Sequence, residues 1–438
     1  MLASASSMLT QLRVKNFRLL RDVTVNFENG LTVFVGPNSS GKSTVLEVLD
    51  FIARCADESL SAAIVAHGGF GSIRTANTAS PIEIGTKWIF ATTAEGGTGR
   101  NWHLEWTVAL VGAANGRVIV EKETLNDIRD SGSRTIVSMN DKGERIVLPE
   151  STSDQEPSEV KSSGVLAFEA VKDENRYPGL WWLNIVAQQI RVLGSLTAPP
   201  AWARSGAVVP SPRDSLVVGV EPFLGRQGIG LANVLYNLST DHRDAWAELE
   251  RAFRGEFPFV QRIVFPPDPG GSKISVAVED ERFPGRKIYA SEMSDGMVAF
   301  LSLLSAVLHP QQAAVLGLDE PDANIHPSAL RRLLALAQRP HMRRAIAIVT
   351  HSNALLDQLS DAAKSIRVVE PTNEGAIIKT LDGPALVAWR TEYSLSEMRR
   401  TGLVDSANIA YGGGNPALSP EATKPKRMNS KRRPSKIG

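Results

Sequence analysis

An apolar run, a glycine-bearing loop and a helical pattern follow one another near the start of the chain, and this order constrains the fold most. Residues 31–35 are continuously apolar, which is typical of a strand covered on both faces. The stretch STVLEVLDFIARC after the loop has helical period. Between the two, GPNSSGKS fits the pattern G-x-x-x-x-G-K-[ST], in the context that separates a phosphate-binding loop from a chance match. We therefore expect a P-loop at this place.

Each residue type in this loop has a physical task. Glycines let backbone N–H groups turn inward around phosphate oxygens, Lys42 would reach the β and γ phosphates, and Ser43 would offer its hydroxyl to Mg²⁺. The helix after the loop would aim the positive end of its dipole at the anion. We predict that ATP and Mg²⁺ are bound by the consecutive residues Gly36, Pro37, Asn38, Ser39, Ser40, Gly41, Lys42, Ser43 and Thr44.

Two later strands bring polar residues to the same edge of the predicted sheet. Residues 313–318 are apolar and end in Asp319 and Glu320, which is costly unless the strand opens onto a polar site, although two such acids also suit a solvated turn. Asp319 would hold Mg²⁺ through its water shell, and Glu320 would polarise the attacking water or accept its proton. The apolar residues 345–349 would deliver His351 to a γ-phosphate. The predicted catalytic residues are Lys42, Glu320 and His351, and the predicted metal ligands are Ser43 and Asp319.

A short polar segment precedes a helical run in the second half of the chain. Ser294, Asp295 and Gly296, within SEMSDGM, stand before VAFLSLLSAVL, and by themselves they are a good helix cap. We expect a helix over residues 296–308. The segment lies about 25 residues before Asp319, and this spacing gives it a further meaning.

These motifs together resemble an ABC-type ATPase of the RecF/SMC-like branch, which includes the ATPase domains of OLD-family proteins. The resemblance implies an ABC fold in which residues 293–297 are the signature motif. In such proteins two protomers face head to tail, so Ser294 and Gly296 would close over the γ-phosphate bound by the other copy. Residues 321–326 would form the loop that communicates across the dimer, with His326 in a structural role. The resemblance is carried by KNFR, GPNSSGKST, GIGLANVLYNL, MSDGM, LGLDEPDANIHP, THSNALLD and WRTEYSLSEMRRTGLVD.

The chain departs from the family pattern in four respects. Asp295 stands where transporter ATPases have glycine, and about 250 residues separate Lys42 from Ser294, which argues against a transporter. The glutamine that usually follows the first ATPase lobe has only weak candidates, Gln188 and Gln189. OLD-family nucleases carry a Toprim domain that needs a glutamate and a D-x-D pair. Fewer than about 90 residues follow His351 and they contain no D-x-D, so we expect no nuclease activity in this chain.

The pattern of elements predicts an α/β protein, a P-loop NTPase of ABC type whose split core carries an antiparallel β lobe and an inserted helical lobe. Residues 81–120 predict an antiparallel meander, residues 151–164 a mobile loop, and residues 181–193 and 231–253 helices. The expected parts are residues 1–75 for the N-terminal half of the core, 76–165 for the β-rich lobe with its loop, 166–258 for the helical lobe, 259–412 for the C-terminal half of the core, and 413–438 for a disordered basic tail.

Composition limits the partners. The chain has 48 Lys and Arg against 47 Asp and Glu, so a strong field for nucleic acid is absent and any DNA contact would be local, for example through the basic tail. A single cysteine, Cys55, excludes an internal disulfide. Without a signal peptide or a run of about 20 apolar residues, we expect a cytoplasmic protein with no membrane partner. Trp181 and Trp182 are expected to pack a helix rather than stack on bases.

We predict an ATPase that forms a homodimer or a higher homo-oligomer through ATP-sandwiched sites. Its change between closed and open states would sense or regulate DNA or a separate effector protein such as a nuclease or toxin, and by analogy it would act in bacterial anti-phage defence or DNA repair. The alternative is an ATP-loaded scaffold or assembly switch with very slow hydrolysis. A phosphotransferase is the less favoured third hypothesis, because the acid pair and the signature motif already account for attack by water.

Overall fold

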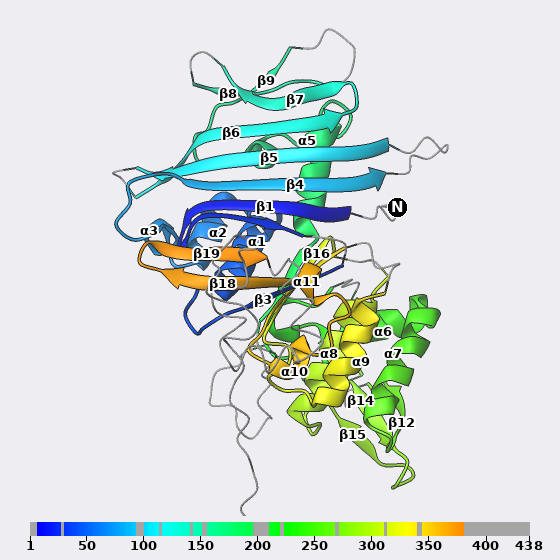
Figure 1. Ribbon diagram of the computed structural model, residues 1–438. Helices are drawn as coiled ribbons and strands as arrows, with labels where there is room; N and C mark the ends of the chain where they lie inside the picture. The colour runs from blue at the N-terminus through cyan, green and yellow to red at the C-terminus, as the bar shows by residue number, and fades with distance from the viewer. Residues whose placement is uncertain are drawn as a thin grey trace, which may run out of the picture.

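The computed structural model describes residues 7–27, 30–92, 100–113, 116–140, 143–150, 156–194, 196, 210–219, 223–267, 271–310, 313–339 and 344–380. One 14-stranded sheet runs through these residues in the order β10-β16-β17-β3-β18-β19-β2-β1-β4-β5-β6-β7-β8-β9. A lobe of helices lies beside the parallel end of this sheet, and the antiparallel strands form the other lobe (Figure 1).

The parallel part of the sheet positions the predicted site. Successive residues of its central strands face the two sides of the sheet and are buried on both, which explains their continuous apolar sequences. In register, Asp319 pairs with Val349, and Val349 pairs with Phe34, so the three strands end at one edge. The parallel strands are β10 (Ile190–Leu193), β16 (Val315–Asp319), β17 (Ala345–Val349), β3 (Gly30–Val35) and β18 (Ile366–Thr372).

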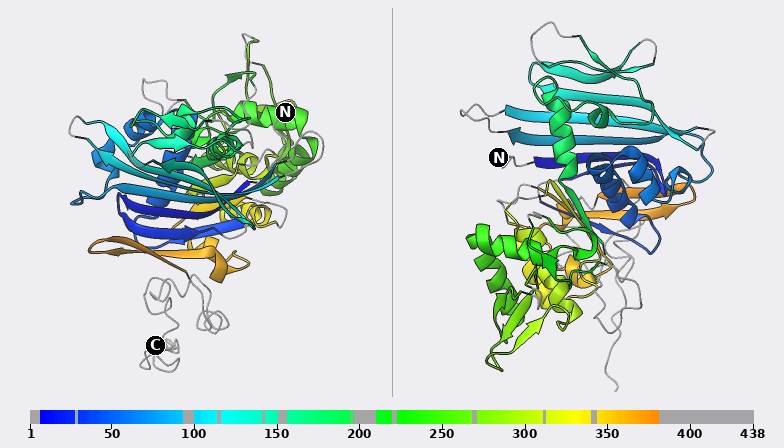
Figure 2. Two further views of the ribbon diagram at one scale, coloured as in Figure 1. Left: turned by 90° about the horizontal axis from the view of Figure 1, so that it is seen from above. Right: turned by 180° about the vertical axis from the view of Figure 1, so that it is seen from behind.

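The remaining strands continue the sheet with antiparallel pairing, apart from one parallel pairing of Ala376 with Leu20. The antiparallel meander predicted over residues 81–120 is confirmed. Helix α5 (Pro178–Gln188) lies against the meander on the face turned away in Figure 1, and Trp182 packs on Phe90 at 5.9 Å between ring centroids (Figure 2). The strands are β19 (Gly375–Thr380), β2 (Leu20–Asn26), β1 (Ser7–Phe17), β4 (Ile82–Thr92), β5 (Arg100–Gly112), β6 (Val118–Arg129), β7 (Gly132–Met139), β8 (Arg145–Val147) and β9 (Ser158–Val160). The helices beside them are α1 (Lys42–Asp57), α2 (Leu60–Ala66), α3 (Phe70–Ile73) and α4 (Ala167–Ala170).

The helical lobe packs the helix that begins at Asp295 against three neighbours. This helix, α8 (Asp295–Leu308), begins one residue before its predicted start and is almost wholly buried. Its neighbours are α6 (Leu231–Asp241), α7 (Arg243–Glu256) and α9 (Pro327–Ala337). Short elements complete the lobe: η2 (Arg226–Gly228), β11 (Leu216–Val217), β12 (Val260–Val264), β13 (Lys273–Ile274), β14 (Ala277–Asp280) and β15 (Lys287–Tyr289), with α10 (Asn353–Leu356) and α11 (Ala362–Ser365) near the last strands.

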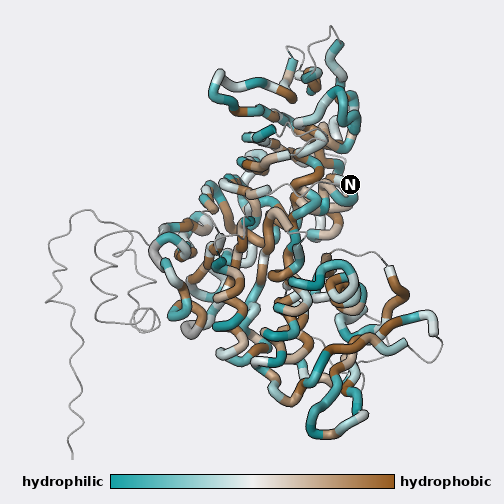
Figure 3. Tube along the Cα trace, turned by 90° about the vertical axis from the view of Figure 1, so that its right-hand side faces the viewer, coloured by the Kyte–Doolittle hydropathy of each residue, from teal (hydrophilic) through white to brown (hydrophobic). Residues whose placement is uncertain are grey.

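Two hydrophobic cores share the central strands. Val33 and Val35 face the core of the helical lobe, whereas Phe34 faces the core beneath α1 and the meander. Hydrophobic segments accordingly run through the middle of the molecule (Figure 3). No helix among the described residues is long and apolar enough to span a bilayer.

Three predicted elements differ from the structure. Residues 181–193 were predicted as one helix, but α5 ends at Gln188 and residues 190–193 form edge strand β10 on β16, because a pairing partner decides the state of so short an apolar run. Residues 231–253 form two helices that break at His242, after Ser239 and Thr240 turn their hydroxyls onto the backbone oxygen of Tyr236. The loop predicted over residues 151–164 contains β9, which pairs with β8.

The five domain ranges expected from the sequence stay predictions. The sheet itself runs across residue 75, since β1 pairs with β4. The basic tail and the family-like segment WRTEYSLSEMRRTGLVD lie outside the described residues.

Candidate nucleotide site

The loop between β3 and α1 has the backbone that a phosphate site needs. Gly36 has a φ of 153°, and a Cβ added to it would lie 2.1 Å from the backbone oxygen of Val369, so no larger residue fits. Ser39 (φ 60°) and Gly41 (φ 97°) are left-handed, a backbone form that turns successive N–H groups toward one point. Gly41 immediately precedes α1, so the positive end of this helix opens into the loop.

Lys42 is the first residue of α1, and its side chain folds back into the loop. The residue is 4% exposed, and Nζ donates to the backbone oxygens of Gly36 at 3.1 Å and Pro37 at 2.6 Å. Phosphate oxygens would be stronger acceptors for a buried ammonium group than these carbonyls. The side chain therefore lies where the sequence placed it, and its contact with phosphate stays a prediction.

Ser43 and Asp319 meet from distant parts of the chain. Ser43 Oγ donates to Asp319 Oδ1 over 3.1 Å and so links α1 to the end of β16. Burial raises the pKa of the Asp319 carboxyl, and the nearby Glu320 carboxylate adds to the rise, whereas the Ser43 hydrogen bond opposes it. A hydroxyl and a carboxylate suit Mg²⁺, which takes its other ligands from water and phosphates.

Glu320 follows Asp319 in a strained turn. Its φ is 48°, which is uncommon for a residue with a side chain, and its N–H donates to the backbone oxygen of Val349 over 2.8 Å. The turn brings Glu320 Oε1 to 3.8 Å from His351 Nε2, with side-chain exposures of 48% and 37%. A carboxylate and an imidazole therefore face the same opening from the ends of two parallel strands.

The loop, the acid and the histidine line one hollow of about 610 Å³, which is large enough for a nucleotide. Asp319 joins it through Ser43. Leu19, in the turn between β1 and β2, forms a further wall that sequence reasoning missed. The lining residues are Leu19, Asn38, Ser39, Ser40, Gly41, Lys42, Ser43, Thr44, Glu320 and His351.

The signature residues Ser294 and Gly296 do not line this hollow. Ser294 is exposed and caps α8, with Oγ accepting from the N–H of Met297 at 3.3 Å. A Cβ on Gly296 would lie 3.0 Å from the backbone oxygen of Asn324, so the glycine allows α8 to approach the loop after β16. The structure therefore keeps these two predicted ligands apart from the P-loop of the same chain.

Thr350 fastens the loop after β16 to the strand ends. Its hydroxyl donates to Asp322 Oδ1 over 2.6 Å, and its N–H donates to the backbone oxygen of Phe34 over 3.3 Å. His326 caps α9, since its Nδ1 accepts from the N–H of Ser328 at 3.3 Å. This contact agrees with the structural role predicted for His326.

Gln188 and Gln189 do not reach the hollow. Gln188 Nε2 donates to the backbone oxygen of Ala56, and Gln189 Oε1 accepts from Ser7 Oγ, each over 3.0 Å. Both lie at the end of α5. Because β10 runs parallel to β16, the end of β10 at Leu193 lies at the edge of the sheet that carries the site, and the end of α5 lies at the opposite edge. The two glutamines are therefore withdrawn as candidates for the family's glutamine.

A second hollow, of about 560 Å³, shares Leu19 with the first. Arg18, Arg21 and Arg74 line it, with one acid among the other lining residues. Arg18 also pairs with Glu47 of α1, with 3.0 Å between Nε and Oε2. Of these three arginines only Arg18 lies in KNFR, one of the segments that carry the family resemblance.

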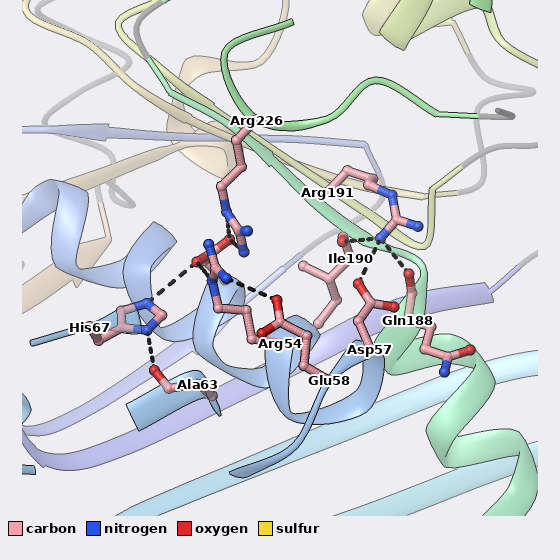
Figure 4. Close-up of polar contacts among 10 residues, drawn as sticks. Arg54, Asp57, Glu58, Ala63, His67, Gln188, Ile190, Arg191 and Arg226 are labelled. Carbon is pink, nitrogen blue, oxygen red and sulfur yellow. Dashed lines mark hydrogen bonds and ion pairs between the residues drawn. The ribbon is translucent and has the colours of Figure 1, made fainter. Parts of the chain in front are cut away.

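Farther along α1, Asp50 is the centre of a polar cluster (Figure 4). Its carboxylate accepts from Arg54 Nε at 3.2 Å and from Arg226 Nε at 2.6 Å, and it lies 3.4 Å from His67 Nε2. Arg226 belongs to η2, so the cluster joins the helix after the P-loop to the segment that leads into α6.

The fold and this hollow are those of a P-loop NTPase. The features that define this class here are the loop between β3 and α1, the acid pair at the end of β16 and the histidine after β17.

Comparison with protein families supports this class. Residues 8–159 match the model described as "AAA ATPase domain", and residues 202–357 match "AAA domain, putative AbiEii toxin, Type IV TA system". Over 45 residues the chain is 40% identical to the DNA repair protein RecN of Bacillus subtilis and 42% identical to the DNA replication and repair protein RecF of Streptococcus gordonii. Each match covers 10% of this chain, and the two span 8% and 12% of those proteins.

Solved SMC heads are similar at low identity. The SMC head domain from Thermotoga maritima has a TM-score of 0.40 and 12% identity, over 86% of this chain and 100% of that one. The Smc head domain bound to the C-terminal domain of ScpA, derived from Pyrococcus furiosus, has a TM-score of 0.42 and 13% identity, over 90% and 100%.

Proposed function

We propose that this chain binds ATP with Mg²⁺ in the hollow of the P-loop and hydrolyses it between two copies arranged head to tail. One observation carries the proposal. The P-loop, Glu320 and His351 share a hollow, whereas Ser294 is exposed at the N-terminus of α8 outside it. A γ-phosphate in the hollow would therefore meet Ser294 only from another copy.

In this proposal the residues of one hollow divide the work. Backbone N–H groups of the loop and Lys42 hold the phosphates, and Ser43 with Asp319 holds Mg²⁺, which would neutralise charge on the β and γ phosphates. Glu320 orients the attacking water and accepts its proton, and His351 donates to the γ-phosphate. Ser294 Oγ accepts from the helix N–H, so its hydroxyl proton can be donated to a phosphate oxygen of the neighbouring copy.

The experiment is the size of the particle with ATP. Glu320→Gln removes the base but keeps the loop, so we expect it to bind ATP, to slow turnover by about 100-fold or more, and to accumulate as a larger species. Light scattering after size exclusion measures this, with Lys42→Ala as the matched variant that stays small. Failure of Glu320→Gln to assemble with ATP would overturn the proposal.

The alternative function, a slow ATP-loaded scaffold, can be tested in the same way. It would assemble with ATP, yet single-turnover hydrolysis by the wild type would be no faster than that of Ser294→Arg. A clear difference between the two proteins would favour the working ATPase.

For the biological role, we propose that the ATP-driven change acts on DNA or on a separate effector protein. RecN and RecF are named for DNA repair and replication, and the second family model is named for a toxin system. The OLD-family assignment and a role in anti-phage defence belong to this proposal. Stimulation of the ATPase by duplex DNA would favour the first arm, and copurification with a nuclease or toxin would favour the second.

A further inference from the structure

A buried arginine outside the hollow holds the signature segment. Arg213 lies in the described stretch 210–219, between β10 and α6, and its side chain is 1% exposed. Nothing in the local sequence, SPRDS, indicated a partner for it. Burying a guanidinium is costly unless its N–H groups find strong acceptors, so its contacts are informative.

Three acceptors of Arg213 lie within six consecutive residues that lead into α8. One terminal nitrogen donates to the backbone oxygens of Ala290 at 2.5 Å and Met293 at 2.7 Å. The other donates to the carboxylate of Asp295. The planar, five-donor shape of guanidinium can satisfy such a fork, which an ammonium group could not reproduce. Arg213 therefore binds both neighbours of Ser294, the backbone of Met293 before it and the side chain of Asp295 after it.

Charge gives Arg213 a second task. Asp295 is the first residue of α8 and is 49% exposed, next to the residues proposed to receive a triphosphate. A carboxylate there stabilises the helix dipole but repels a phosphate. The guanidinium of Arg213 offsets the charge of Asp295. Without it, the carboxylate would repel the triphosphate of the other copy and weaken the association of the two copies.

We propose that Arg213 is a positioning residue for the ATP bound by the other copy, because it sets the signature segment around Ser294 and neutralises Asp295. This rests on the proposed head-to-tail ATPase. The proposal also explains why an aspartate stands at position 295, where transporter ATPases have glycine, because its carboxylate is the group that pairs with Arg213. It also gives the inserted stretch between β10 and α6 a part in the composite site.

The first test separates positioning from nucleotide binding. Arg213→Lys and Arg213→Met should lower kcat by about 100-fold, the scale of loss expected from a displaced catalytic group. The Kd for ATP at protein concentrations too low for assembly should stay unchanged, because each copy binds ATP through its own P-loop. A weakened Kd with an unchanged kcat would overturn the proposal.

The second test asks in which copy Arg213 acts. Arg213→Met has an intact P-loop, and Lys42→Ala has an intact signature segment, so a mixed dimer contains one complete site. Arg213→Met supplies the ATP-loaded P-loop and Lys42→Ala supplies the intact signature segment, so an equal mixture should hydrolyse ATP well above the sum of the two variants measured alone. The same recovery is expected from Ser294→Arg mixed with Lys42→Ala, and that pair tests the head-to-tail dimer itself.

The outcomes are distinct. If both mixtures recover, Arg213 acts on the other copy as proposed. If only the Ser294→Arg mixture recovers, the dimer stands and the role of Arg213 is overturned. If neither recovers, the proposed function fails as well.

A further variant covers the case in which Arg213 variants do not fold. Asp295→Ala removes the half-exposed carboxylate while Arg213 keeps its backbone acceptors at Ala290 and Met293, and it should lower kcat, whereas Asp295→Glu should restore most of it by keeping the ion pair. A full rate in Asp295→Ala would overturn the role of the pair.

Discussion

At the residue scale, the nucleotide site gathers groups that are costly until a ligand arrives. Lys42 is a buried ammonium group, and burial raises the pKa of the Asp319 carboxyl. Glu320 holds a backbone conformation that disfavours a side chain. A bound triphosphate with Mg²⁺ would offset the first two costs, which is the physical sense in which these residues form a binding site.

Asp319→Asn tests this cost through pH. Because the folded pKa is raised, the folded protein holds this proton more tightly, and ionisation destabilises the fold as pH rises from the ordinary value of 3.8 through the raised one. Without nucleotide, Asp319→Asn should lose this part of the pH dependence and melt slightly above the wild type at neutral pH, with no such gain near pH 3.8. Thermal melts across that range measure it, and parallel profiles would contradict it.

Ligand addition supplies the control for Asp319→Asn. At about 100 times Kd, MgATP should stabilise the wild type by about 2.7 kcal/mol. Asp319→Asn should lose most of this gain because it removes a ligand of the ion, whereas Glu320→Gln should keep it.

Some site residues could be predicted and others could not, for a physical reason. The P-loop and the acid pair could be predicted because their functional groups belong to consecutive residues. Leu19 is not, because it reaches the hollow only when the turn between β1 and β2 lies against Gly41, where an added Cβ would be 3.4 Å from Leu19 Cβ. Arg213 is similar, since its partners are about 80 residues away.

At the element scale, strands buried on both faces were predicted well, and an edge strand was not. Residues 345–349 form β17 with the predicted bounds because five apolar residues in the centre of a parallel sheet have one stable state. Residues 190–193 are apolar except for Arg191, yet they follow α5 without a turn signal. Only pairing with β16, which local sequence does not show, makes them a strand.

The link between α1 and η2 gives a prediction at this scale. Arg226 is 42% exposed, whereas Asp50 is 16% exposed and also faces Arg54 and His67. Arg226→Ala should therefore cost at most about 1 kcal/mol, as for other exposed ion pairs. Asp50→Ala should cost more, because it leaves two further groups without their acceptor. A double-mutant cycle by urea unfolding measures the coupling, and zero coupling would show that the pair does not join the two elements.

At the scale of the whole molecule, one sheet carries both the nucleotide site and the antiparallel lobe. The two cores share β3 and β17, so neither lobe can lose its strands without exposing the other. Much of this could be expected from the order of elements, but the continuity could not, because the pairing of β1 with β4 joins segments about 70 residues apart. We infer that the sheet makes the described residues one cooperative unit.

Arg145 tests that cooperativity far from the P-loop. It donates to Glu123 over 2.8 Å in the antiparallel lobe, where the side chains are 3% and 0% exposed. Arg145→Met leaves Glu123 buried without its charge partner and should cost about 3–5 kcal/mol. Arg262→Met, which removes a 63% exposed arginine paired with Glu279, should leave stability nearly unchanged. In calorimetry, each variant should melt in a single transition that MgATP raises as it does in the wild type. Two transitions, of which only one responds to MgATP, would show that the shared sheet does not couple the lobes.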